Sequence, residues 1–310
     1  MRLFLIRHGE TVHNVGLAWA GTTDSTLTNH GVLQIQRLAQ YFTSCRIKFT
    51  RVFSSDLKRA QLTAEGICAE PSQQIQQQLG GPALTPLLTP YLREQYFGTL
   101  EGANMKSSRT ASGQNYGGMD TGFSTVSAES QASMEARVNA FLSEYLLPVL
   151  LNDTSDDETV AVVAHGVILR VLWLCITSLF NPQDIRFGPG VAWNLRPGVP
   201  FIPFWSNTGF VELYIQRRLP PESLTLSKFS TPSQQDFTSG VQETAPPVQS
   251  TLPETSPSDA LLSGWTMDVL AVDSKAHLAD LRCTRGGIGS AAYDERQQKI
   301  DSFFGKSGVY

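Results

Sequence analysis

Two apolar segments that lie far apart in the sequence end in the same dipeptide, His-Gly. Residues 3–6 lead into Arg7-His8-Gly9-Glu10, and residues 159–164 lead into His165-Gly166. Unbroken apolar runs with many branched residues are typical of strands that are buried on both faces of a parallel sheet. The carboxyl ends of parallel strands lie along one edge of the sheet, where ligands bind. We therefore expect His8 and His165 to face one pocket.

A third apolar run, residues 51–54, is followed by Ser55, Asp56 and then a helical pattern. Either Ser55 or Asp56 is expected to cap that helix, and Arg59 would lie in its first turn, near the positive end of the helix dipole. Strand patterns occur at residues 2–6, 51–54, 160–164 and 210–215, and helical patterns at residues 30–43, 56–69, 132–150 and 167–180. This alternation predicts an α/β fold.

The motifs, taken in order, resemble those of the histidine phosphatase superfamily, also called the phosphoglycerate mutase-like family. The matching segments are Arg7-His8-Gly9-Glu10, Ser54–Ala60, Leu92–Gly102, Ala164-His165-Gly166 and Ser206–Gly209. Together they cover roughly residues 1–217, and a chance match of all five is very rare. The resemblance implies a three-layer α/β/α sandwich with a mostly parallel central sheet, and it places a catalytic domain over residues 1–218.

The residue types in these motifs fit the chemistry of phosphate transfer. A phosphate monoester is an anion, so its pocket requires cations that stay charged and hold two oxygens at once, as Arg7 and Arg59 can. Arginines beside a histidine also lower its pKa toward the neutral form, whose free ring nitrogen can attack phosphorus. The family resemblance implies that His8 is this nucleophile and becomes phosphohistidine.

The resemblance implies roles for several further residues. Glu94 would protonate the leaving oxygen and then take a proton from the attacking water, with Glu101 as a nearby alternative. His165 would bind phosphate and stabilise charge on the transferring group. The residues expected to contact phosphate or substrate are Arg7, Asn14, Gly21, Arg59, His165, Gly166 and Asn207. No metal or other cofactor is expected, because the arginines and His165 take its electrostatic role.

Other polar and aromatic residues have an alternative interpretation. Asn207 is also consistent with a simple turn before the last core strand. The remaining histidines, His13, His30 and His277, are expected to lie outside the catalytic centre. The aromatic residues that fit either a pocket wall or the core are Trp19, Tyr96, Phe97 and Tyr116.

The segments after Asn14 and after Gly102 bear on the type of reaction. A mutase must hold its displaced product, and phosphoglycerate mutases carry extra Arg and Lys residues in these segments. Here residues 15–21 contain no basic residue, and residues 103–130 contain only Lys106 and Arg109. We therefore favour hydrolysis of a phosphorylated small molecule. The alternatives are a phosphomutase, and a phosphate-binding protein that its C-terminal region recruits to a partner.

Composition limits the class of protein. The chain has 310 residues, a hydrophobic fraction of 41% and a net charge of -4. These values suit one sizeable core and argue against direct nucleic-acid binding over the whole surface. No segment approaches the roughly 20 apolar residues of a membrane-spanning helix. The scattered cysteines and the direct start of the first strand predict an intracellular protein, cytoplasmic or nuclear, without a signal peptide.

The C-terminal third differs from the rest of the chain. Residues 219–259 are rich in Pro, Ser, Thr and Gln, which predicts a disordered linker. Residues 260–310 follow as a tail, in which residues 264–281 are apolar enough for a helix or strand that docks on the core. Within the catalytic domain, the Ser/Gly-rich residues 103–131 predict an insertion over the pocket.

Near the end of the tail, Gln297, Ile300, Phe303 and Phe304 resemble the box that binds the replication sliding clamp, PCNA. The three apolar side chains would share one face of a single helical turn and form a compact hydrophobic plug. The alternative is an amphipathic turn that packs on the catalytic domain itself. A sliding clamp is thus a candidate partner besides the small-molecule substrate.

Overall fold

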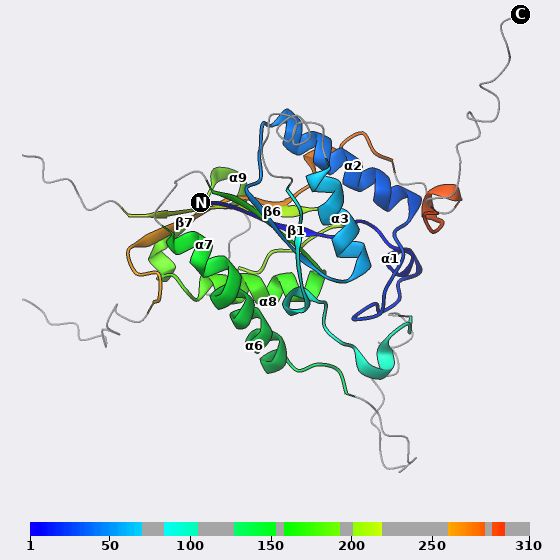
Figure 1. The fold of residues 1–310 in the computed structure, drawn as a ribbon, viewed down its shortest axis with the longest axis horizontal. Coiled ribbons are helices and arrows are strands. Elements are labelled where there is room, and N and C mark those ends of the chain that lie inside the picture. Colours follow the sequence, from blue (N-terminus) through cyan, green and yellow to red (C-terminus); the bar gives the residue numbers. More distant parts are fainter. Residues whose placement is uncertain are drawn as a thin grey trace, which may run out of the picture.

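The computed structural model of the chain describes residues 1–69, 84–104, 127–152, 158–192, 201–218, 260–282 and 287–294. A seven-stranded sheet crosses its centre and carries helices on both faces (Figure 1). The strands are β1 (Arg2–Arg7), β2 (Arg51–Ser55), β3 (Leu87–Thr89), β4 (Thr159–Ala164), β5 (Ile185–Phe187), β6 (Phe210–Arg217) and β7 (Trp265–Ser274). The α-helices are α1 (Val12–Gly16), α2 (Asn29–Ser44), α3 (Lys58–Cys68), α6 (Gln131–Phe141), α7 (Leu147–Leu151), α8 (Gly166–Thr177) and α9 (Pro189–Ala192).

The strand order brings the two His-Gly segments together. The order in the sheet is β3-β2-β4-β1-β6-β7-β5. β1 pairs in parallel with β4, with Arg7 opposite Ala164, so His8 and His165 leave the sheet side by side. Among the described strands, β6 alone runs antiparallel to its neighbours. The predicted α/β fold with a mostly parallel sheet is therefore confirmed.

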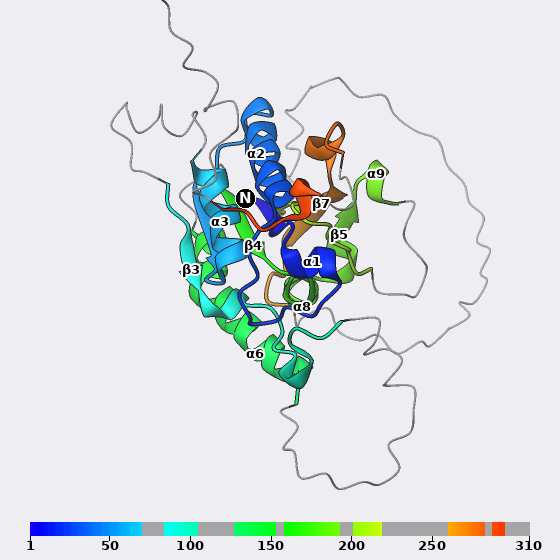
Figure 2. The ribbon, with the colours of Figure 1, turned by 90° about the vertical axis from the view of Figure 1, so that its right-hand side faces the viewer.

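Alternate residues of the central strands face opposite sides of the sheet. Leu3 and Leu5 of β1 belong to the core that α6 and α8 cover, whereas Phe4 and Ile6 belong to the core that α2 and α3 cover. Figure 2 shows these two groups of helices on opposite sides of the strands. Because both faces are buried, the central strands appear in the sequence as continuous apolar runs rather than alternating ones.

The start of α3 differs from the prediction. Its N-cap is Leu57, and no side chain of that residue caps the helix. Instead Asp24, from a distant loop, accepts a hydrogen bond from the first helical N–H at 3.0 Å. Asp56 forms an ion pair elsewhere, and Ser55 Oγ accepts from the N–H of Leu57 at 3.3 Å, one residue before the helix. The prediction of Ser55 or Asp56 as N-cap was wrong because the cap is supplied by a tertiary contact.

The helix predicted over residues 132–150 contains a change of pitch. α6 passes into a π-helical turn at Leu142–Leu146 and then into α7, which ends at Leu151. Pro148 therefore lies in the first turn of α7, where its missing N–H is tolerated. Asn152 is the C-cap residue, close to the predicted helix end.

The C-terminal region adds to the sheet. Residues 264–281 supply β7, which pairs with β6 and β5, so the prediction of a docked helix or strand is confirmed as a strand. The sheet therefore extends beyond residue 218. Residues 287–294 pack on the start of α2, where Tyr293 N donates to the carbonyl oxygen of Leu27 at 2.8 Å. The predicted linker, residues 105–126 of the predicted insertion and the clamp-binding motif lie outside the described residues.

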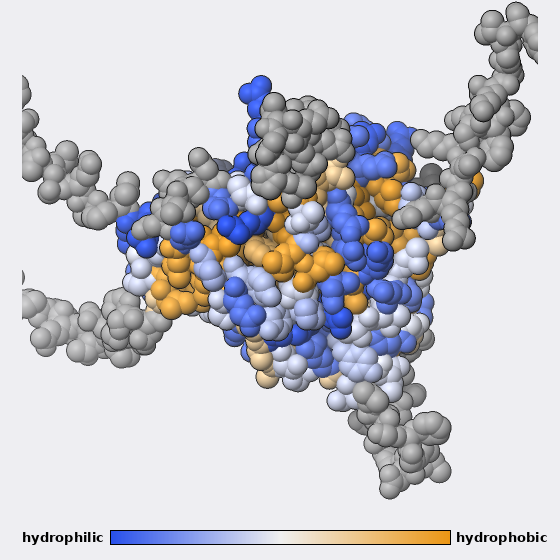
Figure 3. Space-filling model, in the orientation of Figure 1, coloured by the Kyte–Doolittle hydropathy of each residue, from blue (hydrophilic) through white to orange (hydrophobic). Residues whose placement is uncertain are grey.

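The edges of the sheet are short strands. β3 has three residues, two of which, Leu87 and Leu88, are exposed. On the face that Figure 3 shows, hydrophobic residues form patches between hydrophilic ones. Over the part of the chain that the structure describes, no helix is both long and apolar enough to cross a membrane.

Candidate active site

His8 follows β1 directly, and its ring is almost fully buried. Its Nδ1 lies 2.7 Å from the carbonyl oxygen of Gly9. A carbonyl only accepts, so Nδ1 donates, and the neutral ring carries its lone pair on Nε2. Burial and the positive charges of Arg59 and Arg7 lower the pKa of His8 well below its ordinary value. His8 is therefore a neutral imidazole whose Nε2 can act as a nucleophile.

His165 lies beside His8, with the two ring centroids 5.0 Å apart. Its Nδ1 accepts a hydrogen bond from Arg59 Nε at 3.1 Å. The proton of the neutral ring therefore sits on Nε2, which is 2.9 Å from Ser55 Oγ. Burial and the charge of Arg59 lower the pKa of His165 well below its ordinary value. Both ring nitrogens of His165 are thus engaged, one by Ser55 at the end of β2 and the other by Arg59 in the first turn of α3.

Arg7, the last residue of β1, has an unused donor. One terminal nitrogen donates to the carbonyl oxygen of Trp205 at 2.9 Å, whereas Nε is buried without a hydrogen-bond partner among the described residues. A methyl group built on Gly166 would lie 3.8 Å from that Nε and 3.9 Å from Glu94 Oε2. A buried donor without a partner is unfavourable unless a ligand satisfies it. Gly166 therefore leaves room for an anion between Arg7 and Glu94.

Arg59 connects His165 to the loop Ala20–Thr23. Besides its bond to His165, it donates to the carbonyl oxygens of Ala20, Gly21 and Thr23 at distances of 2.7–3.0 Å. Four of its five N–H groups are thus used inside the protein. Burial lowers the pKa of Arg59 to about 10, so the guanidinium remains charged at neutral pH. It therefore orients His165, holds the loop and supplies a fixed charge beside the nucleophile.

Glu101, the alternative acid, organises the same loop from the other side. Its carboxylate accepts hydrogen bonds from the backbone N–H groups of residues 21–23 and of Phe97 at 3.0–3.2 Å. Burial raises the pKa of this carboxyl, but the hydrogen bonds, that of the Thr23 hydroxyl first, outweigh it and lower the pKa overall. A Cβ on Gly21 would lie 2.1 Å from Glu101 Oε1. Gly21 thus allows the close approach of this carboxylate.

Glu94 follows the short 3-10 helix Pro90–Leu92 and is buried. Its Oε1 accepts from the N–H groups of Gln95 and Ile168 at 3.0 and 3.1 Å, and its Oε2 accepts from the N–H of Val167 at 3.1 Å. Two of these donors belong to the first turn of α8, the positive end of its dipole. Oε2 accepts one of these hydrogen bonds and lies near the space beside Gly166, so it keeps a lone pair for a proton.

Asn14 and Asn207 support the backbone at the nucleophile. Asn207 Nδ2 donates to the carbonyl oxygen of His8 at 3.1 Å and to Asn14 Oδ1 at 3.0 Å. Asn14 also forms a capping box with Thr11, the N-cap of α1. Asn207 therefore joins three segments of the site instead of only making a turn.

His277 lies outside the catalytic centre, as expected, but contacts a residue that is hydrogen-bonded to the backbone of Arg7 and His8. Its Nε2 is 3.0 Å from Thr208 Oγ1. The N–H of Thr208 in turn contacts the carbonyl oxygens of Arg7 and His8 at 3.0 and 3.2 Å. Burial lowers the pKa of His277 to about 4, so it is neutral at neutral pH. The C-terminal region is thus packed against the strand end that carries the nucleophile.

A cavity of about 220 Å³ opens above these residues. Its polar lining comprises Arg7, His8, Thr11, Asn14, Arg59, Glu94 and Arg170. Its aromatic lining comprises Trp19, Phe97, Phe204 and Trp205, with the rings of Trp19 and Phe97 4.5 Å apart. Tyr96 is absent from the lining, and Tyr116 lies outside the described residues. A larger hollow of about 410 Å³ also touches Arg59 but is lined by neither His8 nor Glu94, so the smaller cavity is the candidate active site.

Three features of the site were not anticipated from the sequence. Ser55 binds His165, Trp205 binds Arg7, and Arg170 lines the cavity. Arg170 follows Gly166 by four residues, which places both on the same face of α8. This spacing could have predicted from the sequence that Arg170 faces the site. The contacts of Ser55 and Trp205 depend on the strand order and have no local signal. Among the described residues, no group of His, Cys, Asp or Glu side chains is arranged to hold a metal ion.

Comparison with known proteins gives both a family and named relatives. A model of the histidine phosphatase superfamily (branch 1) matches residues 3–189. Relatives include the 2,3-bisphosphoglycerate-dependent phosphoglycerate mutases of Brucella ovis and Brucella canis. Each is 30% identical over 203 residues, which cover 64% of this chain and 90% of the relative.

Solved structures that match the chain include two phosphatases. The α-ribazole phosphatase of Shigella flexneri is 22% identical with a TM-score of 0.47, over 69% of this chain and 90% of that chain. The mycobacterial glucosyl-3-phosphoglycerate phosphatase is 23% identical with a TM-score of 0.47, over 68% of this chain and 89% of that chain.

Proposed function

Because this chain belongs to the histidine phosphatase superfamily (branch 1), we propose that it hydrolyses a phosphate monoester through a phosphohistidine on His8. The state of His8 carries the proposal. Its Nδ1 is committed to the carbonyl oxygen of Gly9, which leaves the lone pair on Nε2. The adjacent Arg7 offers a buried Nε without a partner in the described structure. A nucleophile and an anion-binding donor therefore lie at the same strand end.

The first step transfers the phosphoryl group to the protein. Nε2 of His8 attacks phosphorus, and the bond between phosphorus and the leaving oxygen breaks. Glu94 donates the proton on Oε2 to that oxygen, so the leaving group departs as an alcohol. Arg7 and Arg59 balance the negative charge of the phosphoryl oxygens, because both are buried near the nucleophile and stay protonated. The products are phosphohistidine, the free alcohol and an ionised Glu94.

The second step restores the protein. A water molecule attacks the phosphorus of the phosphohistidine while the Glu94 carboxylate takes its proton. The bond between nitrogen and phosphorus breaks, and its electron pair returns to Nε2 of His8. Inorganic phosphate leaves, and Glu94 is protonated for the next cycle. Every proton of the cycle is thus carried by one carboxyl group, while Nε2 of His8 is the nucleophile of the first step and the leaving group of the second.

The walls of the cavity suggest the nature of the leaving group. Trp19, Phe97 and Phe204 present aromatic surface above the catalytic residues, and Phe204 is 68% exposed at the cavity. Arg170, four residues after Gly166 in α8, is the third arginine of the lining. These features fit an alcohol with an apolar face and a second anionic group. A phosphorylated small molecule of this type is the expected substrate class.

Phosphomutase activity is the second candidate, because the Brucella relatives are named as phosphoglycerate mutases. A mutase must bind a displaced product that carries additional negative charge. The described lining contains three arginines, and Arg59 uses four of its N–H groups inside the protein. Beyond Arg7 and Arg59, the described lining offers only Arg170 as a further cation. One guanidinium can bind one additional anionic group, but a mutase needs several such contacts to retain its displaced product, which favours hydrolysis.

The test is phosphate release from a broad panel of phosphate esters, without added metal. We expect turnover by the wild type and none by His8→Ala. Glu94→Gln should slow turnover and leave inhibition by inorganic phosphate largely intact. Full activity of His8→Ala would refute the mechanism. Interconversion of 2- and 3-phosphoglycerate without phosphate release would support the mutase instead.

A partner is proposed on the sequence motif alone. Gln297, Ile300, Phe303 and Phe304 resemble a clamp-binding box and follow the last described residues, which pack on α2. Their position beyond that contact is compatible with binding outside the catalytic domain. Clamp binding would bring the phosphatase to sites of DNA replication, which in a nucleated cell lie in the nucleus.

A further inference from the structure

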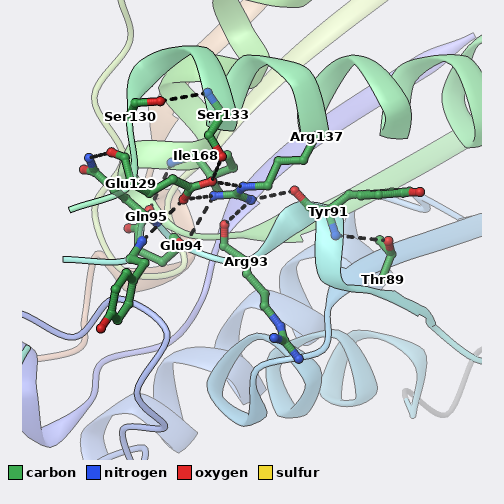
Figure 4. Close-up of polar contacts among 11 residues, drawn as sticks. Thr89, Tyr91, Arg93, Glu94, Gln95, Glu129, Ser130, Ser133, Arg137 and Ile168 are labelled. Atoms are coloured by element: carbon green, nitrogen blue, oxygen red, sulfur yellow. Dashed lines mark hydrogen bonds and ion pairs between the residues drawn. The ribbon is translucent and has the colours of Figure 1, made fainter. Parts of the chain in front are cut away.

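The loop that carries Glu94 is held by a single arginine of α6. Arg137 donates one terminal nitrogen to the carbonyl oxygens of Tyr91 and Arg93, at 2.7 and 2.6 Å (Figure 4). Its second terminal nitrogen donates to the carbonyl oxygen of Glu94 itself at 3.3 Å. This nitrogen and Nε also bind the carboxylate of Glu129, at 3.0 and 2.8 Å. All five N–H groups of the guanidinium are therefore used.

Glu129 holds the following residues of the same loop. Its backbone N–H donates to the carbonyl oxygen of Tyr96 at 2.8 Å, and its carbonyl oxygen accepts from Gln95 Nε2 at 2.8 Å. Its carboxylate accepts from Ser133 Oγ at 3.0 Å in the first turn of α6. The side chains of Arg137 and Glu129 are only 17% and 14% exposed, so this pair is well shielded from solvent. The loop from Tyr91 to Tyr96 is thus held by both partners.

The backbone and the side chain of Glu94 are held by different helices. Its carbonyl oxygen faces Arg137, whereas its carboxyl group accepts hydrogen bonds from the N–H groups of Val167 and Ile168 in α8. The guanidinium therefore fixes the backbone on one side while the helix fixes the carboxyl on the other. Neither Arg137 nor Glu129 lines the cavity. The hydrogen bonds of this pair therefore reach the site through the backbone of the Glu94 loop. The charge of Arg137 also helps to lower the pKa of His165, and Arg137→Lys keeps that charge while it removes the hydrogen bonds.

We propose that Arg137, supported by Glu129, is a positioning residue that sets the distance from the carboxyl group of Glu94 to the leaving oxygen. The inference rests on the proposed function, in which Glu94 is the general acid and base. A shift of about 1 Å in a catalytic group is enough to cost about a hundredfold in rate. A lysine cannot replace this arginine, because its three donors on one nitrogen cannot reach three carbonyl oxygens and a bidentate carboxylate.

The leaving group distinguishes positioning of the acid from general support of the fold. An alkyl phosphate needs a proton on its leaving oxygen, whereas p-nitrophenyl phosphate releases a stable phenolate without one. Loss of general acid catalysis therefore slows the alkyl ester selectively. Loss of folded protein lowers turnover of both esters equally. The ratio of kcat/KM for the two esters is thus a direct measure of general acid catalysis by Glu94.

The experiment compares this ratio in wild type, Glu94→Gln, Arg137→Met and Arg137→Lys. We expect both Arg137 variants to lose about a hundredfold in kcat/KM for the alkyl ester, and less than about fivefold for p-nitrophenyl phosphate. Inhibition by inorganic phosphate should change little, because Arg7 and His8 are untouched. The double variant with Glu94→Gln should be no slower on the alkyl ester than Glu94→Gln alone.

Arg93→Gln is the matched control. Arg93 belongs to the same loop and also forms a bidentate pair, with Asp56, at 2.7 and 2.6 Å. Its side chain is 45% exposed, and the hydrogen bonds of its guanidinium go to Asp56 rather than to the backbone of the Glu94 loop. This variant should leave the ratio unchanged. Glu129→Gln keeps the shape of the pair and tests it again if the Arg137 variants do not fold, with the same selective loss expected.

Three results would overturn the proposal in distinguishable ways. Equal losses for both esters in the Arg137 and Glu129 variants would mean that the pair only supports the fold. An unchanged ratio in these variants, with a selective loss in Glu94→Gln, would refute the positioning role and leave the proposed function standing. No selective loss in Glu94→Gln itself would remove Glu94 as the acid, and the positioning role with it.

Discussion

Mild acid should destabilise this protein because two buried histidines are neutral in the native state. Burial and neighbouring arginines hold the pKa of His8 and of His165 well below 6.5. In the unfolded chain both rings regain an ordinary pKa and take up protons below that value. The unfolded state then binds more protons than the native state, so the free energy of unfolding falls as the pH falls below about 6.5.

The size of the effect follows from linkage. Each histidine lowers the free energy of unfolding by about 1.4 kcal/mol for every pH unit below the pKa that it has in the unfolded chain, as long as the native ring stays neutral. Between pH 7 and about pH 5 this amounts to about 2 kcal/mol for each histidine, or about 4 kcal/mol for the pair. This is a large part of the 5–15 kcal/mol that typically separates a folded domain from its unfolded state.

The assay is urea unfolding at pH 7 and at about pH 5, for wild type and His8→Asn. Buffers must be free of phosphate, since a bound anion would stabilise the native state by itself. Asparagine does not titrate, so the variant should lose about 2 kcal/mol less than wild type between the two pH values. Carboxylates contribute equally to both proteins and cancel in this difference. An identical pH dependence in the two proteins would refute the neutral state of His8.

Two glycines and the C-terminus give further predictions. Gly21→Ala should cost about 2 kcal/mol in the free energy of urea unfolding, because its Cβ would lie 2.1 Å from Glu101 Oε1; an unchanged stability would contradict this packing. Gly166→Ala should unfold like wild type but weaken inhibition by inorganic phosphate about tenfold, since its methyl group would enter the space beside Arg7 Nε; unchanged inhibition would place the anion elsewhere. Removal of residues 295–310 should abolish clamp binding in a pull-down and leave phosphate release intact, and retained clamp binding would dismiss the motif.

Much of the fold was predictable because the central strands are buried on both faces. Such strands need continuous apolar residues, so β1 and β4 appear in the sequence within one residue of their observed bounds. The edge strands β3 and β5 have three residues each and little burial, and they leave no such pattern. The sequence did not decide whether the segment that forms β7 would be a helix or a strand, because its pairing with β6 is a long-range contact.

The candidate site was predictable in its residues but less so in its contacts. His8, Arg7 and Glu94 line one cavity, and His165 lies next to His8. The sequence did not indicate that most of the N–H groups of Arg59 would donate to carbonyl oxygens of the loop Ala20–Thr23. Contacts of this kind depend on how separate segments fold together, and no local spacing encodes them.

The most direct test of the account is detection of the covalent intermediate. Wild-type protein is mixed with a substrate ester that it turns over, quenched within one turnover, and digested for mass spectrometry under conditions that preserve phosphohistidine. The account predicts one phosphoryl group on His8, at Nε2, which disappears as phosphate is released and does not form in His8→Ala. Phosphate release by wild type at full rate with no phosphoryl group on His8 at any time would contradict it.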